Sequence, residues 1–273
     1  MSETAEQFRD RLINQYNEIA RLAGALAHEI KNPLSTIRLN LDLMVEDLDP
    51  PESQKERRTL VKLETVRGEC KRLQNLLDEF LNFARARQLQ LRPGNLNKVV
   101  QSVLDFFLPA AVESGIDLSA YLANDLPSVM LDEESLYRAL LNLIINAQQA
   151  ICHSADKTPQ SAADSRKPVI STDSASPNES GYIGRILVRT HAQGDCVVLE
   201  IIDDGPGMNK AVWQKCFDAF YSTKRGGSGL GLPTVKQVVE AHGGTIELQS
   251  EEGKGTRFTI VFPLLPRLET EDK

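Results

Sequence analysis

The sequence lacks an excess of positive charge and long hydrophobic runs, and each absence excludes a class of protein. There are 31 Lys and Arg residues against 38 Asp and Glu residues, so the net charge is −7 and the pI is about 5.3. A protein that binds nucleic acid normally carries a basic surface, so we expect no nucleic-acid partner. No run approaches the roughly 18 apolar residues of a membrane span, so we expect no span in this chain.

The N-terminal sequence and the cysteines set further limits. Residues 1–6 are acidic and lack the basic and apolar regions of a signal peptide, so we expect a cytoplasmic protein. The cysteines form no C-x-x-C pair and lie far apart, at Cys70, Cys152, Cys196 and Cys216. We therefore expect neither a disulfide framework nor a zinc site. With 273 residues, of which 41% are hydrophobic and 25% charged, the chain has room for two globular domains.

The first part of the chain has the hydrophobic periodicity of two long helices. Apolar residues recur at steps of three and four over residues 12–48 and again over residues 63–84. The repeat slips by one residue around Pro33, and a proline inside a helix removes a backbone donor and crowds the preceding turn. We therefore expect a kink or a loosened turn at Pro33.

The connection between the two helices is short. Residues 49–51 (Asp-Pro-Pro) interrupt the first helix, and Ser53 followed by Glu56 predicts a capping box that starts the second. Two long helices joined in this way predict an antiparallel, all-α hairpin over residues 1–90. One hairpin cannot bury both apolar stripes well, whereas two copies form a four-helix bundle with a closed core. We therefore expect a homodimer.

Residues 91–266 alternate short strands with helices, which predicts an α/β sandwich with the helices segregated to one side of the sheet. We expect helices over residues 97–113, 132–151 and 234–241. We expect strands over residues 116–118, 129–131, 185–190, 197–202, 245–248 and 256–262. Residues 153–181 are rich in Ser, Asp and Pro and poor in large apolar side chains, which predicts a disordered insertion.

One histidine lies off the apolar stripe of the first helix. Helical geometry places His28 about 200° from Leu26 and about 160° from Ile30 in the opposite sense, so we expect it to be exposed. A neutral imidazole in water is a competent nucleophile, and Glu29 beside it can orient the ring or take a proton. Asn32, one turn later, shares the face of His28. An ordinary surface histidine would have the same spacing, so spacing alone does not decide the role of His28.

No G-x-x-x-x-G-K-[ST] sequence occurs, which excludes a P-loop, yet other motifs suit a nucleotide. Asn142 and Asn146 are four residues apart, hence on one face of the helix expected over 132–151. Amide groups inside an apolar run cost stability unless they have partners. A Mg²⁺ ion prefers oxygen ligands, and an amide carbonyl together with water and phosphate oxygens can supply them.

Two glycine-containing motifs follow. Asp203 ends an apolar strand, and its carboxylate can accept a hydrogen bond from an amine such as that of adenine. Gly205 and Gly207 let a base approach the backbone. A second glycine-containing segment lies at the start of a helix, where its backbone amides and the positive end of the helix dipole can bind phosphates. This segment contains Gly227, Gly229, Leu230 and Gly231. Each motif alone also fits a simple turn, but their order and spacing together favour a nucleotide site.

These motifs resemble known families. Their order resembles the ATP-binding domain shared by histidine kinases, gyrase, Hsp90 and MutL, known as the GHKL or Bergerat fold. Residues 28–33 (His-Glu-Ile-Lys-Asn-Pro) resemble the phospho-acceptor box of sensor histidine kinases. The resemblance covers the chain from about residue 16 to residue 263, apart from the insertion. Gln149 and residues 221–224 are more similar to the nitrogen-regulation branch of these kinases, since many other members carry a basic residue at the position of Gln149.

The resemblance implies roles for particular residues. His28 would receive the γ-phosphoryl group of ATP, Glu29 would act as general base, and Asn32 would support phosphatase chemistry. Asn146 would bind Mg²⁺, and Asp203 would bind the adenine amine. A mobile lid is implied over residues 207–227. The other implied nucleotide-binding residues are Asn142, Gly205, Gly207, Lys224, Gly227, Gly229, Leu230 and Gly231.

By this resemblance the chain is an ATP-dependent protein histidine kinase. It would autophosphorylate His28 and pass the phosphoryl group to an aspartate on the receiver domain of a response regulator. The alternatives are a conformational ATPase of the gyrase or Hsp90 kind and an inactive ATP-binding scaffold. Gyrase-like ATPases carry a glutamate where this chain has Asn142 and lack a phospho-acceptor hairpin. A scaffold would bind ATP without forming acid-labile phosphate.

Overall fold

The computed structural model describes residues 24, 27, 29–85, 89–155, 182–224 and 227–264. The start of the first expected helix, His28 and most of the insertion expected over 153–181 lie outside the described residues. The chain divides into two compact units, residues 1–88 and 89–273, and each unit is described by itself. Within the described residues, no helix is long and apolar enough to cross a membrane.

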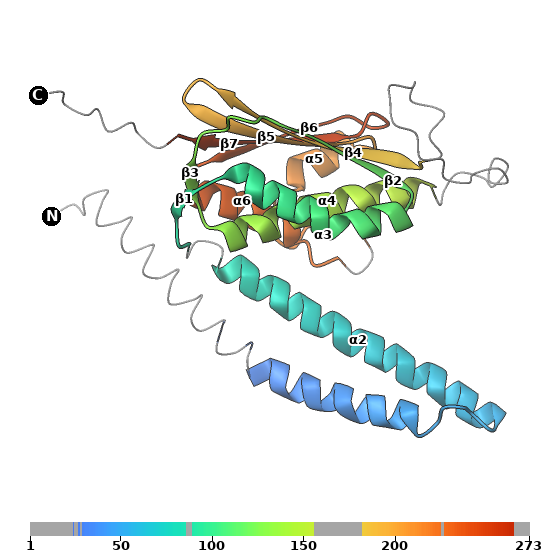
Figure 1. The fold of residues 1–273 in the computed structure, drawn as a ribbon. Helices are drawn as coiled ribbons and strands as arrows, with labels where there is room; N and C mark the ends of the chain where they lie inside the picture. The colour runs from blue at the N-terminus through green and yellow to red at the C-terminus, as the bar shows by residue number, and fades with distance from the viewer. Residues whose placement is uncertain are drawn as a thin grey trace, which may run out of the picture. The chain divides into compact units, whose positions relative to one another are not determined.

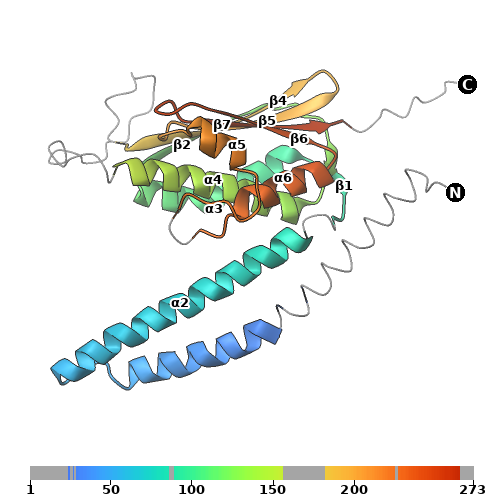
Figure 2. The same ribbon diagram turned by 180° about the vertical axis from the view of Figure 1, so that it is seen from behind.

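The first unit contains an antiparallel helical hairpin. Its helices cover residues 29–46 and Gln54–Arg85 (α2), and they run side by side in both views (Figures 1 and 2). The capping box at the start of α2 is confirmed. The Ser53 hydroxyl accepts from the Glu56 N–H at 3.2 Å, and the Glu56 carboxylate accepts from the Ser53 N–H at 3.1 Å. The carboxylate also accepts from the Glu52 N–H, and these hydrogen bonds lower the pKa of Glu56.

Polar pairs join the two helices along one side of the hairpin. Lys31 forms a salt bridge with Asp78 at 3.0 Å, and Arg67 lies 3.6 Å from Asp42. Between these pairs, the Gln74 amide donates to the Ser35 hydroxyl at 3.4 Å. Such exposed pairs contribute little free energy individually, but they favour one register of the helices over its alternatives.

The second unit has a layer of helices against a sheet, as Figures 1 and 2 show. The five-stranded sheet has the order β2-β4-β5-β7-β6, in which β2 and β4 are parallel and all other neighbours antiparallel. Its strands are β2 (Ile116–Leu122), β4 (Gly184–Gln193), β5 (Cys196–Asp203), β6 (Thr245–Ser250) and β7 (Thr256–Pro263). The mixed sheet with helices on one face confirms the predicted α/β sandwich.

Three helices cover the inner face of the sheet: α3 (Leu96–Glu113), α4 (Glu133–Ala155) and α6 (Gly231–Ala241). Each presents an apolar stripe that meets the alternating inward residues of the strands. The largest of these fully buried side chains include Leu96, Ile116, Leu140, Leu143, Ile186, Leu199, Ile260 and Phe262. Side chains also fix the helix starts. The Asn95 amide oxygen accepts from the Asn97 N–H at 2.9 Å, and the Asp132 carboxylate accepts from the Ser135 N–H at 3.0 Å.

Two elements were not predicted. The strand β1 (Arg92–Gly94) pairs antiparallel with β3 (Val129–Leu131) in a separate two-stranded sheet. The helix α5 (Lys210–Lys215) lies inside the segment expected to be a lid loop, and it starts at Asn209, whose side chain accepts from the Val212 N–H. Elements of three and six residues are too short to show a hydrophobic period.

Candidate functional site

Two of the predicted phosphotransfer residues lie on the surface of the hairpin. Glu29 and Asn32 are exposed on the helix of residues 29–46. The side chain of Lys31 is engaged with Asp78, and the backbone carbonyl of Asn32 accepts from the Thr36 hydroxyl. His28, the predicted phosphoryl acceptor, lies outside the described residues. Two of the three predicted phosphotransfer residues, Glu29 and Asn32, therefore have the solvent access that phosphotransfer needs.

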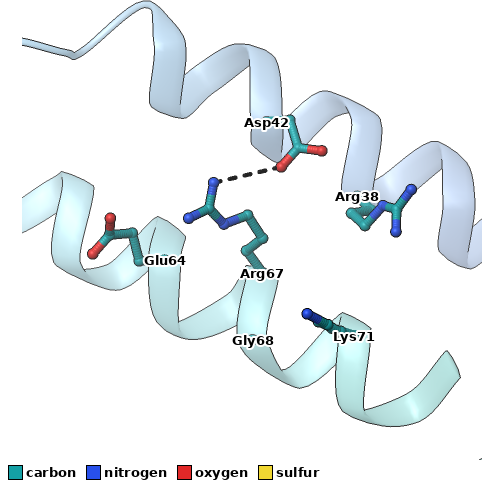
Figure 3. Close-up of a pocket in the computed structure, with 6 residues that line it drawn as sticks. All are labelled: Arg38, Asp42, Glu64, Arg67, Gly68 and Lys71. Carbon is teal, nitrogen blue, oxygen red and sulfur yellow. Dashed lines mark ion pairs between the residues drawn. The ribbon is translucent and has the colours of Figure 1, made fainter. Parts of the chain in front are cut away.

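A charged groove lies farther along the same hairpin, with a volume of about 420 Å³. Figure 3 shows Arg38 and Asp42 on one helix facing residues 64–71 on α2. Gly68 forms part of its wall, and a methyl group added there would meet no atom within 4 Å. The groove is lined by Arg38, Asp42, Glu64, Arg67, Gly68 and Lys71. Five of these six residues are charged, which suits a surface that contacts another macromolecule more than a site for a small apolar ligand.

The helix α4 carries the predicted Mg²⁺ ligand. Asn142 and Asn146 are both half-buried, while Leu143, Ile144 and Ala147 on the other side of the helix are fully buried in the core. The Asn146 Oδ1 atom accepts a hydrogen bond from the Lys224 ammonium at 2.7 Å. The carbonyl of Asn146 therefore already binds a cation, which is the property that a metal ligand needs.

Asp203 ends β5 on the helix-covered face of the sheet. Only 6% of its surface is exposed, and its Oδ1 atom accepts from the Gly205 N–H at 3.0 Å. Burial raises the pKa of Asp203 to about 6, because the charged carboxylate loses water that its hydrogen bonds only partly replace. A methyl group added at Gly205 would lie 2.8 Å from Asp203 Oδ1 and 3.5 Å from Ala150 on α4. Asp203 and Gly205 thus lie against the helix that carries Asn146.

Gly207 shapes the turn after Asp203. Its φ is +65°, and a methyl group there would come within 2.0 Å of the Glu251 carbonyl oxygen. Both observations require glycine, because an L side chain would be strained and would clash. The next residue, Met208, donates its N–H to the Ser250 hydroxyl at 2.9 Å. The turn is thereby fixed against the end of β6.

The second glycine motif ends at the N-terminus of α6, as predicted. Leu230 is buried at the N-cap position, and Gly231 is the first residue of the helix. A methyl group added at Gly231 would lie 3.9 Å from Asn146 Nδ2, so the start of α6 lies beside the predicted metal ligand. Gly229, with φ +69°, accepts from the Phe220 N–H at 3.0 Å and closes the base of the loop. Free amides at a helix N-terminus suit phosphate oxygens.

Lys224 is the cation at the centre of this cluster. Its ammonium donates to Asn146 Oδ1 at 2.7 Å and to Gln149 Oε1 at 2.6 Å, so one side chain joins the loop to α4. Burial lowers the pKa of Lys224. Its backbone is held by the Ser222 hydroxyl and by the Gly227 N–H, which donates to the Lys224 carbonyl at 3.2 Å.

The residues fit a Mg²⁺ ion that shares its ligands with a nucleotide. Within the described ranges, no group of three or more His, Cys, Asp or Glu side chains could hold a metal by itself. The Asn146 oxygen alone is insufficient, and phosphate oxygens and water would complete an octahedral shell. In the sequence, Gln149 differs from the basic residue that many other members of the resembled family carry at this position. Its contact with Lys224 spans 75 residues of chain, so no local pattern signals it.

Comparisons with known proteins agree with this geometry. A family described as "Histidine kinase-, DNA gyrase B-, and HSP90-like ATPase" matches residues 131–266, and the "His Kinase A (phospho-acceptor) domain" family matches residues 18–89. The signal transduction histidine-protein kinase AtoS of Escherichia coli is 29% identical over 97% of this chain and 38% of its own length. The sensor histidine kinase ZraS of E. coli is 31% identical over 90% of this chain and 46% of its own length.

Solved structures share the fold. Full-length ShkA in complex with AMPPNP has a TM-score of 0.63 and 24% identity, over 89% of this chain and 45% of ShkA. ThkA in complex with the response regulator protein TrrA has a TM-score of 0.58 and 22% identity, over 97% of this chain and 69% of that chain. The chain spans less than half the length of the curated relatives AtoS and ZraS. With both family domains in this order, the chain belongs to the sensor histidine kinases of two-component systems.

Proposed function

We propose that this chain is an ATP-dependent protein histidine kinase that phosphorylates its own His28. The observation that carries the proposal is the cluster at α4, where an amide oxygen, an ammonium and a glycine-rich helix start converge. Phosphoryl transfer depends mainly on positioning and on neutralising charge, and this cluster supplies both. The family of the chain supports the same reaction.

ATP would lie against α4. Asp203 would accept from the adenine amine, with Gly205 and Gly207 beside the base. Bound Mg²⁺ would neutralise phosphate charge, and Asn146 would hold it while Asn142 lies one turn away near the phosphates. The backbone around the start of α6 and the Lys224 ammonium would contact phosphate oxygens. The loop residues in this role are Gly227, Gly229, Leu230 and Gly231.

The chemical step uses residues of the hairpin. A neutral imidazole nitrogen of His28 attacks the γ-phosphorus as the bond from that phosphorus to the bridging oxygen of ADP breaks. The bridging oxygen leaves with both electrons of that bond, and ADP is the product. Glu29 takes the proton that the imidazole loses when phosphohistidine forms. Asn32, on the same exposed face, would orient water in the dephosphorylation of a docked receiver.

A homodimer accounts for the apolar surface of the hairpin. Side chains of both predicted stripes are about half exposed in the single chain, although such residues normally lie in a core. They include Ile37 at 46%, Met44 at 49%, Val66 at 47% and Leu73 at 50% exposure. A second hairpin would cover them in a four-helix bundle. We assign residues 1–90 to this dimerisation and phosphotransfer hairpin and residues 91–266 to the ATP-binding domain.

The phosphoryl group would then pass to an aspartate on the receiver domain of a response regulator. ThkA, which shares the fold, was solved in complex with the response regulator TrrA, and this supports a partner of that class. The pairing would take place in the cytoplasm, where ATP is available. The gyrase-like alternative is less well supported, because the matched phospho-acceptor family covers the hairpin that those proteins lack. The scaffold alternative differs from the kinase in forming no acid-labile phosphate.

Incubation with γ-labelled ATP tests the proposal. The protein should acquire a label that is stable in base and labile in acid, as expected of phosphohistidine. The Asn146→Ala variant should lose most of the label because it lacks the metal ligand. A label that survives acid, or an unlabelled wild-type protein that still binds ATP, would instead favour the scaffold or the conformational ATPase.

A further inference from the structure

The ammonium of Lys224 occupies the oxygen that the metal needs. Lys224 Nζ lies 2.7 Å from Asn146 Oδ1, and Mg²⁺ would bind that oxygen at about 2.0–2.1 Å. A divalent ion and an ammonium on one carbonyl would stand within about 4 Å of each other, where like charges repel strongly. Lys224 and the metal therefore compete for Asn146.

Gln149 gives Lys224 a second acceptor. Its Oε1 atom accepts from Lys224 Nζ at 2.6 Å, and it lies three residues after Asn146 on the same face of α4. Both acceptors are neutral amides, so they bind the ammonium by hydrogen bonding and add no opposite charge. Gln149 is an exposed residue, and its amide oxygen contacts the side chain of Lys224.

The backbone on both sides of Lys224 is organised for this contact. The Ser222 hydroxyl accepts from the Lys224 N–H at 3.2 Å, and the Gly227 N–H donates to the Lys224 carbonyl at 3.2 Å. At the base of the same loop, Phe220 has a φ of +66° and donates its N–H to the Gly229 carbonyl. A bulky residue in the left-handed region persists only where the surroundings hold it. Hydrogen bonds thus hold the backbone of Lys224 while its side chain contacts α4.

We propose that Gln149 is a positioning residue that holds Lys224 on Asn146 as a placeholder for the metal, so that metal binding and release of the lysine are one exchange. In the metal-free protein, Lys224 ties the loop after α5 to α4. When the metal takes Asn146, the ammonium leaves that oxygen and becomes available to the phosphates. This inference rests on the proposed metal site at Asn146.

The test is a measurement of how strongly Mg²⁺ assists ADP binding. Calorimetry gives the dissociation constant of ADP in EDTA and in saturating Mg²⁺. The metal effect is the dissociation constant in EDTA divided by that in Mg²⁺, so a larger value means that Mg²⁺ assists ADP binding more strongly. Gln149→Ala weakens the hold on Lys224, so the metal effect should rise about three- to tenfold, within the range expected for the net contribution of one hydrogen bond. Gln148→Ala is the matched control, because the amide of Gln148 donates to Ser114 instead, and it should leave the metal effect unchanged.

A double-mutant cycle shows whether Gln149 acts through Lys224. In a Lys224→Met background, Gln149→Ala should have no further influence on the metal effect. An unchanged metal effect in Gln149→Ala alone, or the same rise with and without Lys224, would overturn the inference. Asn146→Ala separates the two claims. If that variant keeps the wild-type metal effect, the metal site itself is wrong, whereas its loss together with an unresponsive Gln149 refutes only the exchange.

Discussion

At the scale of single residues, Asp203 combines a cost in stability with a role in binding. The fold buries its carboxylate and raises its pKa from 3.8 to about 6. Because the folded protein holds this proton more tightly than the unfolded chain, the contribution of Asp203 to stability is greatest below pH 4. It is lost as the pH rises from about 4 through 6. Above pH 6 the folded protein carries a buried charge, which we propose serves to recognise adenine.

Asp203→Asn should therefore stabilise the fold and weaken nucleotide binding. Near pH 8 the free energy of unfolding of the variant should be on the order of 3 kcal/mol higher than that of the wild type, because folding raises the pKa of Asp203 from 3.8 to about 6. That difference should vanish near pH 4, where both side chains are neutral. Denaturant unfolding at the two pH values gives the stabilities, and calorimetry gives the ATP affinity. A variant that is less stable than wild type at pH 8 would contradict the account.

Glu29 and Asn32 are exposed neighbours with different predicted tasks. Glu29→Ala should mainly slow the formation of phosphohistidine, because no carboxylate remains to take the imidazole proton. Asn32→Ala should largely spare that step and reduce the dephosphorylation of a receiver, because the amide that orients water is gone. A time course of phosphohistidine and a receiver-dephosphorylation assay on both variants decide the matter. Equal loss of both activities in both variants would refute the separation.

At the scale of elements, two glycines show when a missing side chain matters. Gly68 lies inside α2, where an added methyl group meets no atom within 4 Å. Gly68→Ala should stabilise the hairpin by about 0.5–1 kcal/mol, because alanine is the better helix former. Gly207→Ala should destabilise the ATP-binding unit, because its methyl group would lie 2.0 Å from the Glu251 oxygen at a φ of +65°.

Thermal or denaturant unfolding of the two glycine variants tests the contrast, since the chemical change is identical and only the surroundings differ. If Gly68→Ala stabilises the hairpin yet slows phosphotransfer to a receiver, the groove of Figure 3 also serves as a contact surface. If Gly207→Ala unfolds like wild type, the turn after Asp203 is more adaptable than its geometry indicates.

The long helices and the strands of the main sheet could be predicted from the sequence, whereas β1 and α5 could not. The stripe of α2, the Ser53–Glu56 capping box and the strands of the main sheet each leave a local pattern, and the structure confirms them. The strand β1 exists because β3 pairs with it, a contact across more than thirty residues of chain. The helix α5 has six residues and depends on its Asn209 cap. Neither has a period that a sequence pattern could reveal.

The candidate site also contains some features that the sequence could predict and others that it could not. Asn146, Asp203 and the glycines belong to motifs with fixed order, so they could be predicted as site residues from the sequence, and the structure brings Asn146 beside Gly231. The contact of Lys224 with Gln149 joins two segments 75 residues apart. Glutamine at position 149 was visible only as a departure from the pattern of relatives. Its partner could be found only in three dimensions.

At the scale of the whole molecule, the segment between α4 and β4 can be shortened. The described chain stops at residue 155 and resumes at residue 182, close to the end of α4 and the start of β4. Replacing residues 156–181 with a short Gly-Ser linker should leave autophosphorylation within a few fold, because the entropy of loop closure changes slowly with length. Circular dichroism and labelling with γ-labelled ATP check this. Loss of folding in the shortened protein would show that the segment packs against the domain.

The central claim is that the phosphoryl group of ATP ends on His28. The most direct measurement is labelling of His28→Gln with γ-labelled ATP, beside calorimetry of ATP binding by the same variant. The acid-labile label should disappear while ATP affinity and the unfolding midpoint stay at wild-type values, because the helical period predicts that His28 lies off the apolar stripe. Undiminished labelling of His28→Gln would contradict the account and place the acceptor elsewhere in the chain.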